Sequence, residues 1–231
     1  MLHLILADSE LERVPKEISG EPLIREEARK RGKDPTEILL NSNYHHGIME
    51  EMVDSYRRGR PDLVHVCMLY ALESPLNKDN MLRLYIHTRN DEVIKVKPKT
   101  RIPRSFNRFV GLIEQLFKEG GVPPGDPLME LEKSSLKDIV KEIQPERTFI
   151  FSSKGVDLTE TNCKHDFSSE DPLCAVIGGF PKGDFISNVE SLSDSVVSIY
   201  PKPLNSVTVV GHVIQIYEEE FTSWPYGPRK S

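Results

Sequence analysis

Two turns in the last third of the chain have residue types that let a protein backbone bind a small molecule. The first, Gly178-Gly179-Phe180-Pro181-Lys182-Gly183, follows the apolar run CAVI. Glycine allows the backbone to approach a ligand closely where a side chain would obstruct it. The glycine spacing fits neither GxGxxG nor a P-loop, and no Lys-Ser/Thr pair follows. Taken alone, this segment is better explained as a plain structural turn.

The second turn, Ser198-Ile199-Tyr200-Pro201-Lys202-Pro203-Leu204, leads from a predicted strand into a predicted helix. Three apolar, β-rich runs in this part of the chain end in polar or glycine residues: RTFIFSS, CAVIGG and SVVSIY. Strands that alternate with helices predict a mainly parallel sheet, whose ligands bind beyond the carboxyl ends of the strands. We therefore expect a pocket at the turns that follow these three runs.

A basic segment from Lys95 to Arg108 lies upstream and reads KVKPKTRIPRSFNR, without an acidic residue. Its planar guanidinium lets arginine bind phosphate bidentately and stack on bases, which suits contact with RNA. A solvated charged face is the alternative interpretation. The arginines of this segment are Arg101, Arg104 and Arg108.

The net charge of −6 argues against nucleic-acid binding, because lysine and arginine must neutralise the phosphates. The distribution of charge argues for it. A second basic cluster, YRRGR, contains Arg57, Arg58 and Arg60, whereas acidic residues gather elsewhere, as at Glu218–Glu220. Two basic clusters on an acidic background indicate one nucleic-acid face.

Histidines and cysteines predict no metal site. On a helix the adjacent His45 and His46 point in different directions and no third ligand is evident, and Cys163-Lys164-His165-Asp166 lacks a second ligand pair. The sequence contains no GxSxG motif, so it does not indicate a serine hydrolase. Cys67, Cys163 and Cys174 are odd in number and widely spaced, which predicts buried thiols in a reducing compartment.

The elements expected to position these residues alternate between strands and helices. LHLILA reads as a buried strand that ends at Asp8-Ser9, before a helix. MLRLYIHTRNDEVIKVKP predicts two strands that form a hairpin around Arg89-Asn90-Asp91. Helices are predicted over EPLIREEARKRG, GIMEEMVDSYRRG and FVGLIEQLF, with a loop at GGVPPGDP. LVHVCMLYALES fits either a strand or a helix, and LNSVTVVGHVIQIYEEEF is rich in β-branched residues but has helix-length apolar spacing.

The length of 231 residues suits one large α/β domain or a domain with an insertion. No apolar run approaches the roughly 20 residues that a bilayer-spanning helix requires, so we expect a soluble protein without a membrane partner.

Several long motifs occur together in an order that resembles one known family. They are RGRPDLVH, ALESPLNK, LYIHT, RIPRSFNRFVGLIEQLF, GGFPKGDF and SIYPKPL, between Ala7-Asp8-Ser9 and Leu204. The chain resembles the archaeal-type pseudouridine-N1 methyltransferases of small-subunit ribosome biogenesis, a branch of the SPOUT superfamily.

This resemblance implies one SPOUT α/β domain over residues 1–231, with an inserted β-hairpin and loop extension. It further implies a C-terminal trefoil knot, although knots are rare, and a cofactor-binding knot region over 148–210. S-adenosylmethionine would be held mainly by backbone groups, which is consistent with an apolar slot for a neutral adenine. The implied cofactor residues are Phe151, Gly178, Gly183, Ile199, Tyr200, Pro201, Lys202, Pro203 and Leu204.

The resemblance also implies the substrate and its contacts. Small-subunit rRNA would be bound by Arg60 and by Arg101, Arg104 and Arg108 of the basic segment 95–108, with Asp62 orienting Arg60. The family further implies a cytoplasmic homodimer with its pocket near the subunit interface.

Pseudouridine determines the chemistry that the site must perform. Its C-glycosidic link leaves N1 as an imino N–H, which must lose a proton as N1 attacks the sulfonium-activated methyl group. Positioning of the two reactants and accommodation of the developing charge are the main requirements. Asp8 and Asp62 are candidate bases, but no catalytic residue is assigned. Two alternatives stay open: a non-catalytic rRNA-binding assembly factor, and a SPOUT ribose 2′-O-methyltransferase.

Overall fold

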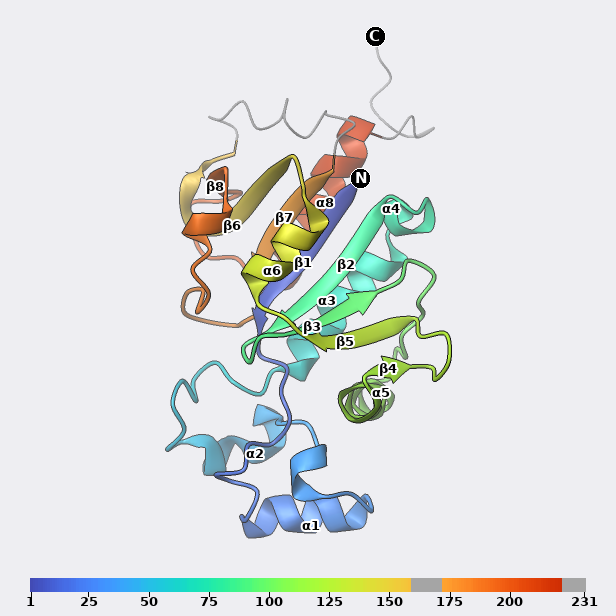
Figure 1. Ribbon diagram of the computed structural model, residues 1–231. Helices are drawn as coiled ribbons and strands as arrows, with labels where there is room; N and C mark the ends of the chain where they lie inside the picture. The colour runs from blue at the N-terminus through green and yellow to red at the C-terminus, as the bar shows by residue number, and fades with distance from the viewer. Residues whose placement is uncertain (159–171, 222–231) are drawn as a thin grey trace.

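The computed structural model describes residues 1–158 and 172–221, and these residues form an eight-stranded sheet (Figure 1). Its spatial order is β4-β5-β3-β2-β1-β7-β6-β8. The strands are β1 (Leu2–Ser9), β2 (Leu82–Thr88), β3 (Glu92–Val96), β4 (Gly121–Val122), β5 (Met129–Lys133), β6 (Arg147–Asp157), β7 (Leu173–Gly178) and β8 (Ser195–Ser198).

The sheet has a parallel part and an antiparallel edge. β1 pairs in parallel with β2 and β7, and β6 pairs in parallel with β7 and β8. β3, β5 and β4 add an antiparallel edge beside β2. These pairings confirm the mainly parallel sheet and the hairpin around Arg89-Asn90-Asp91. β6, however, continues to Asp157, beyond the predicted RTFIFSS, with a register shift against β8 between Phe151 and Val156.

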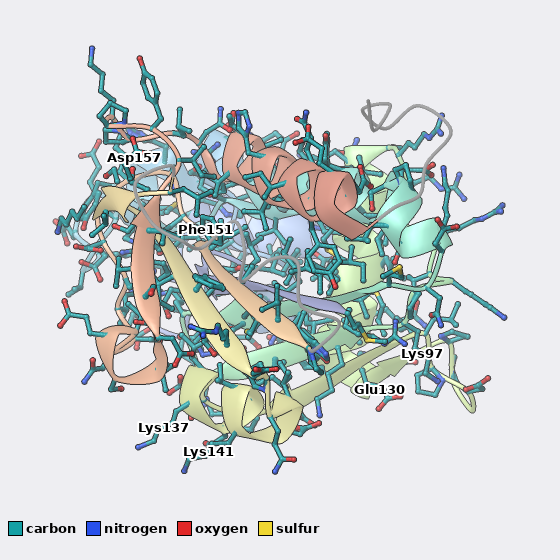
Figure 2. The ribbon with its side chains drawn as sticks, turned by 90° about the horizontal axis from the view of Figure 1, so that it is seen from above. Lys97, Glu130, Lys137, Lys141, Phe151 and Asp157 are labelled. Carbon is teal, nitrogen blue, oxygen red and sulfur yellow. The ribbon has the colours of Figure 1, made fainter. Side chains whose placement is uncertain are left out.

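Helices cover both faces of the sheet. They are α1 (Pro22–Lys30), α2 (Ser42–Met49), α3 (Pro61–Glu73), α4 (Pro75–Lys78), α5 (Phe106–Glu119), α6 (Leu136–Ile143) and α8 (Ser206–Phe221), with short 3-10 turns at Pro35–Glu37 and Glu190–Leu192. Figure 2 shows α6, marked by Lys137 and Lys141, on the face opposite α8. None of the helices within the described residues is long and apolar enough to span a membrane.

The undecided segment LVHVCMLYALES forms the helix α3. Pro61 stands in its first turn, where the missing N–H costs nothing, and Asp62 places a negative charge at the positive end of the helix. Its thirteen residues also exceed the usual length of a buried strand.

The predicted helix over 47–59 is wrong beyond Met49. α2 begins at Ser42, where the Asn41 side chain accepts a hydrogen bond from the Asn43 N–H, and ends at Met49. Turns follow, with Asp54 in the left-handed region at φ 58°. Buried ion pairs made by Arg57 and Arg58 hold this stretch, so tertiary contacts override the local helical spacing.

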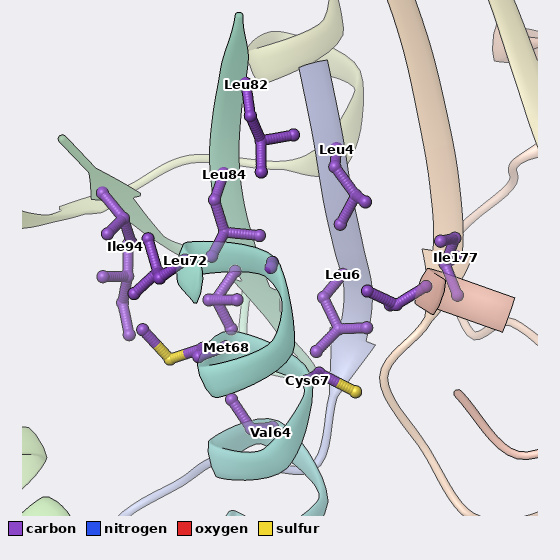
Figure 3. Packing of buried hydrophobic residues seen from close by; sticks show 14 of the residues in the cluster. Leu4, Leu6, Val64, Cys67, Met68, Leu72, Leu82, Leu84, Ile94 and Ile177 are labelled. Carbon is purple, nitrogen blue, oxygen red and sulfur yellow. The ribbon is translucent and has the colours of Figure 1, made fainter. Parts of the chain in front are cut away.

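The core lies on both sides of β1. Leu4 and Leu6 belong to one buried cluster with Val64 and Met68 of α3 (Figure 3). The alternate residues Ile5 and Ala7 face the other side, in a cluster with Ile139 and Val140 of α6. A buried parallel strand is apolar on both faces, and this explains the continuous run LHLILA.

The cysteines agree with the predicted buried thiols where the structure describes them. Cys67 and Cys174 are buried and free, and burial raises the pKa of each thiol to about 12. Cys163 and the segment Cys163-Lys164-His165-Asp166 lie outside the described residues.

Candidate functional site

A cavity of about 340 Å³ lies at the carboxyl ends of β7 and β8, beside residues 151–153 of β6. Its walls are the loop 178–185 after β7 and the loop 198–204 after β8, and Val209 of α8 also lines it. Its lining mixes apolar side chains with backbone, as in many small-molecule sites. The predicted pocket is therefore present at the expected turns.

The structure brings together nearly all the residues predicted to bind a cofactor. Pro201 does not line the cavity. Those that do are Phe151, Gly178, Gly183, Ile199, Tyr200, Lys202, Pro203 and Leu204.

Close approach of backbone and side chains explains the glycines of the first loop. A Cβ atom on Gly178 would lie 2.6 Å from the Phe180 ring, and one on Gly179 would lie 2.8 Å from the Cα of Ser9. Gly183 has φ 90°, a conformation that other residues rarely adopt. Larger residues would therefore displace the loop that forms one wall of the cavity.

Arg57 fixes this loop, a role that the sequence did not indicate. Its guanidinium stacks over the Phe180 ring at 4.1 Å from the ring centroid, and its Nη1 donates a hydrogen bond of 2.7 Å to the Asp184 carbonyl. The Nε donates to Glu10, while Nη2 is buried without a hydrogen-bond partner among the described residues. Arg57 thus connects the loop after β1 to the cavity wall.

Buried carboxylates neutralise two arginines that had been predicted to form part of the nucleic-acid face. Glu10 also accepts a 2.8 Å hydrogen bond from Arg89, and Arg58 forms a two-pronged pair with Glu12 at 2.8 and 2.7 Å. Burial raises the pKa of Glu10, while hydrogen bonds from Arg89 and Arg57 oppose that rise. Arg57 is therefore committed to the interior, whereas Arg58 pairs with Glu12 and keeps 13% of its side-chain surface exposed. Their charges are matched by carboxylates, and contact of this cluster with RNA stays a prediction.

Asp8 holds the segment that directly follows this wall of the cavity. It is buried, and its carboxylate accepts hydrogen bonds from the Ile186 N–H at 2.7 Å, the Ser187 N–H at 3.0 Å and the Ser187 hydroxyl at 2.6 Å. It does not line the cavity. The geometry gives Asp8 a structural role and does not support it as the proton acceptor.

A second cavity, of about 460 Å³, adjoins the first. Arg60 lines it, and its guanidinium makes hydrogen bonds of 2.9 and 2.8 Å to the two carboxylate oxygens of Asp62. Pro181 and Lys182 line both cavities, so the loop after β7 separates them. The sequence did not indicate this second cavity.

The basic segment is anchored beside the helix that Arg60 caps. His65 of α3 donates a 2.7 Å hydrogen bond to the Pro103 carbonyl and stacks on Phe109 at 4.3 Å. Arg101, Arg104 and Arg108 are exposed and form no ion pair within residues 1–158 and 172–221. Lys95 and Lys97, by contrast, pair with acidic side chains of the antiparallel edge and α6. Lys99 is likewise exposed and without an ion pair in the described ranges, so the three arginines and Lys99 are the part of the segment available to a ligand.

The two adjacent histidines have different surroundings. His45 is buried, accepts a 3.1 Å hydrogen bond from the Asn41 N–H and pairs with Glu27 at 2.9 Å, whereas His46 lines the second cavity. Within the described ranges, no group of three His, Cys, Asp or Glu side chains is placed to hold a metal.

The His45–Glu27 pair predicts a pH dependence of stability. The hydrogen bond from His45 lowers the pKa of Glu27 below its ordinary value of 4.5, while burial opposes the change. A lowered carboxyl pKa stabilises the fold above pH 4.5, and this contribution is lost as the pH falls through the folded-state value. The free energy of unfolding of the wild type should fall as the pH drops below 4.5, and we expect this fall to be smaller in Glu27→Gln. Urea titration at several pH values measures it. Glu51→Gln, at an exposed position, is the control; equal acid dependence of the wild type and Glu27→Gln would refute the prediction.

Comparisons with known proteins agree on one family. The family model described as EMG1/NEP1 methyltransferase matches residues 4–218. A protein named ribosomal RNA small subunit methyltransferase Nep1, from Thermococcus onnurineus, is 47% identical over 94% of this chain and 98% of its own length. The protein of that name from Pyrococcus furiosus is 47% identical over 95% of this chain and 97% of its own length.

A solved structure resembles the whole fold. The crystal structure of Archaeoglobus fulgidus Nep1 bound to S-adenosylhomocysteine has a TM-score of 0.84 and 35% sequence identity, and it covers 94% of this chain and 97% of its own chain.

Proposed function

The chain belongs to the EMG1/NEP1 methyltransferase family, and on that premise we propose that it methylates N1 of a pseudouridine in small-subunit rRNA. S-adenosylmethionine is the methyl donor, and the reaction serves small-subunit biogenesis in the cytoplasm. The observation that carries the proposal is the pair of adjoining cavities, one framed by the two C-terminal loops and the other lined by Arg60.

The first cavity has properties that suit the cofactor. Its volume of about 340 Å³ lies in the range of small-molecule sites, and Gly178 keeps its backbone free of side-chain obstruction. Backbone groups of the loops 178–183 and 199–204 would hold the nucleoside, with Phe151 in the cavity wall. The relative bound to S-adenosylhomocysteine supports this choice of ligand. When bound, the cofactor supplies an electrophilic methyl group.

The second cavity is the proposed site of the target base. Arg60 provides a positive charge at its rim, and its hydrogen bonds and charge lower the pKa of Asp62 although burial acts the other way. An ionised Asp62 that bonds both prongs of the guanidinium holds Arg60 in one orientation. Asp62 therefore acts as a positioning residue for an RNA contact.

The trefoil knot of residues 148–210 is part of the proposal. The chain leaves β8 at the edge of the sheet, yet Ser206, at the start of α8, donates a 2.5 Å hydrogen bond to the Gly178 carbonyl at the end of β7. This return supports a crossing of the chain at the cavity. The connection from β6 to β7 includes residues 159–171, outside the described residues.

A homodimer is also proposed, formed across α3 and α8. Val66 and Tyr70 of α3 expose 46% and 49% of their surface, and the Tyr70 ring lies against Gly211 of α8. Large apolar side chains exposed together on α3, beside α8, favour contact with another protein surface.

Transfer of a labelled methyl group to an rRNA hairpin tests the proposed function. A hairpin with pseudouridine at the target position should be labelled, and its uridine counterpart should not, because uridine N1 carries the ribose and has no proton to lose. Equal labelling of the two hairpins would contradict the proposed specificity for pseudouridine. Nucleoside analysis that finds a 2′-O-methyl group would support the ribose methyltransferase, and absence of both labelling and cofactor binding would support the assembly factor.

Arg104 offers a separate test of the RNA face. We expect Arg104→Ala to weaken hairpin binding about 5- to 20-fold, because an exposed cation that contacts phosphate is lost. The salt dependence of binding should also become shallower, which fluorescence anisotropy at several salt concentrations measures. S-adenosylhomocysteine affinity should not change; a parallel loss would contradict the division between cofactor and RNA surfaces. Lys137→Ala on α6 is the control.

A further inference from the structure

The loop after β7 presents one lysine to both cavities. Lys182 lines the cavity between the C-terminal loops and also the cavity that contains Arg60. Its neighbour Pro181 does the same, but carries no charge. A group at this wall lies between the proposed cofactor site and the proposed base site.

The other cations of the second cavity are engaged by carboxylates. Arg58 pairs with the buried Glu12, and Arg60 pairs with Asp62. Lys182 is exposed and forms no ion pair or hydrogen bond within the described part of the chain. Among the lysine and arginine side chains of the described residues that line the second cavity, Lys182 is thus the one that is not paired with a carboxylate.

The backbone around Lys182 is held from both sides. Arg57 stacks on Phe180 before it and donates to the Asp184 carbonyl after it. The Asp184 side chain pairs with Lys154 of β6. The flexible side chain of Lys182 therefore extends from a fixed support, which limits where its ammonium group can reach.

We propose that Lys182 is a catalytic residue whose ammonium group stabilises the negative charge that develops on the target pyrimidine when N1–H loses its proton. This inference rests on the proposed function. The charge spreads from N1 to the two carbonyl oxygens of the ring, where a cation in a partly enclosed site is more effective than one in water.

The reaction balances without Lys182 gaining or losing a proton. The N1 lone pair forms the new N–C bond, the C–S bond breaks with its electron pair going to sulfur, and the N1 proton passes to water. A lysine ammonium carries its charge near neutral pH, as this role requires. The charged or titratable groups around Lys182 are His46, Glu50, Tyr56, Arg58 and Arg60 in the second cavity, and Asp184, Tyr200 and Lys202 in the first.

Single-turnover kinetics with the pseudouridine hairpin, at saturating RNA and cofactor across a range of pH, test this role. Lys182→Met should slow methyl transfer about 100-fold, the order of effect seen when one stabilising group is removed from a developing anion. Its rate should keep rising to higher pH than that of the wild type, because proton loss from N1 is no longer assisted. Lys182→Arg should recover much of the rate. Lys141→Met, on the outer face of α6, should behave as wild type.

Binding constants separate this role from a purely structural or anchoring one. Affinities of Lys182→Met for the hairpin and for S-adenosylhomocysteine should stay within about twofold of wild type. A weaker hairpin affinity with an unchanged saturated rate would show a phosphate contact and overturn the proposal. A weaker cofactor affinity with an unchanged saturated rate would overturn it equally, by placing the ammonium group on the cofactor. If the wild type itself does not methylate the hairpin, the proposed function fails and this inference fails with it.

Discussion

Gly178→Val should weaken S-adenosylhomocysteine binding at least about 100-fold, or about 2.7 kcal/mol, while hairpin affinity stays within about twofold. A Cβ atom at this position would lie 2.6 Å from Phe180, and the two further methyl groups of valine need space at the lining of the cavity. The arginines proposed to bind RNA belong to other elements, so the substitution should weaken cofactor binding and leave RNA binding unchanged. Isothermal titration calorimetry measures the first affinity and fluorescence anisotropy the second.

Gly111→Val serves as the matched control for this substitution. Apart from its chain neighbours and the backbone of its own helix, α5, no atom lies within 4 Å of a Cβ atom built on Gly111. Circular dichroism should show that both variants are folded. Unchanged cofactor affinity in a folded Gly178→Val protein would contradict the close approach of backbone and ligand.

Arg57→Met should lower the free energy of unfolding by about 3 kcal/mol, the lower end of the range for breaking a buried ion pair. Glu10 loses one of its two arginines, and Phe180 loses the cation stacked on it. The lower end is expected because Arg89 still pairs with Glu10, and because methionine also removes the buried Nη2 that lacks a partner among the described residues. Urea titration measures this free energy.

A double-mutant cycle shows whether Glu10 is the cause. Arg57→Met combined with Glu10→Gln should be less destabilising than the sum of the two single changes, because the combination leaves no unpaired buried charge. Arg29→Met, at an exposed position of α1, should change stability by less than about 0.5 kcal/mol. A loss below about 1 kcal/mol for Arg57→Met would refute its place as a support of the cavity wall.

Local patterns were enough to predict six of the eight strands and the first cavity, but β5 was not predicted and β4 lies within the predicted loop GGVPPGDP. CAVIGG and SVVSIY are apolar runs that end in turns, and the backbone at such ends is where a parallel sheet exposes its ligand site. The motif order added the cofactor residues, all of which line the cavity except Pro201. The exposed arginines of 101–108 were also foreseeable, because nothing acidic lies near them in the sequence.

Local sequence patterns could not predict ion pairs between residues that lie far apart in the sequence. Arg57 and Arg58 looked like part of a basic surface, but their partners Glu10 and Glu12 lie 47 and 46 positions away. The same contacts end the helical spacing of 47–59 at Met49. The position of Lys182 between two cavities depends likewise on residues 42–60 folding against the loop after β7. Periodicity and composition carry no information on such contacts.

A crystal structure of the protein with S-adenosylhomocysteine tests the central claim most directly. We predict the ligand in the cavity between the loops 178–185 and 198–204, with backbone groups near Gly178 and Leu204 in contact with it and the second cavity left open toward Arg60. A ligand bound outside this cavity, or a second cavity closed off from the sulfur atom, would contradict the account.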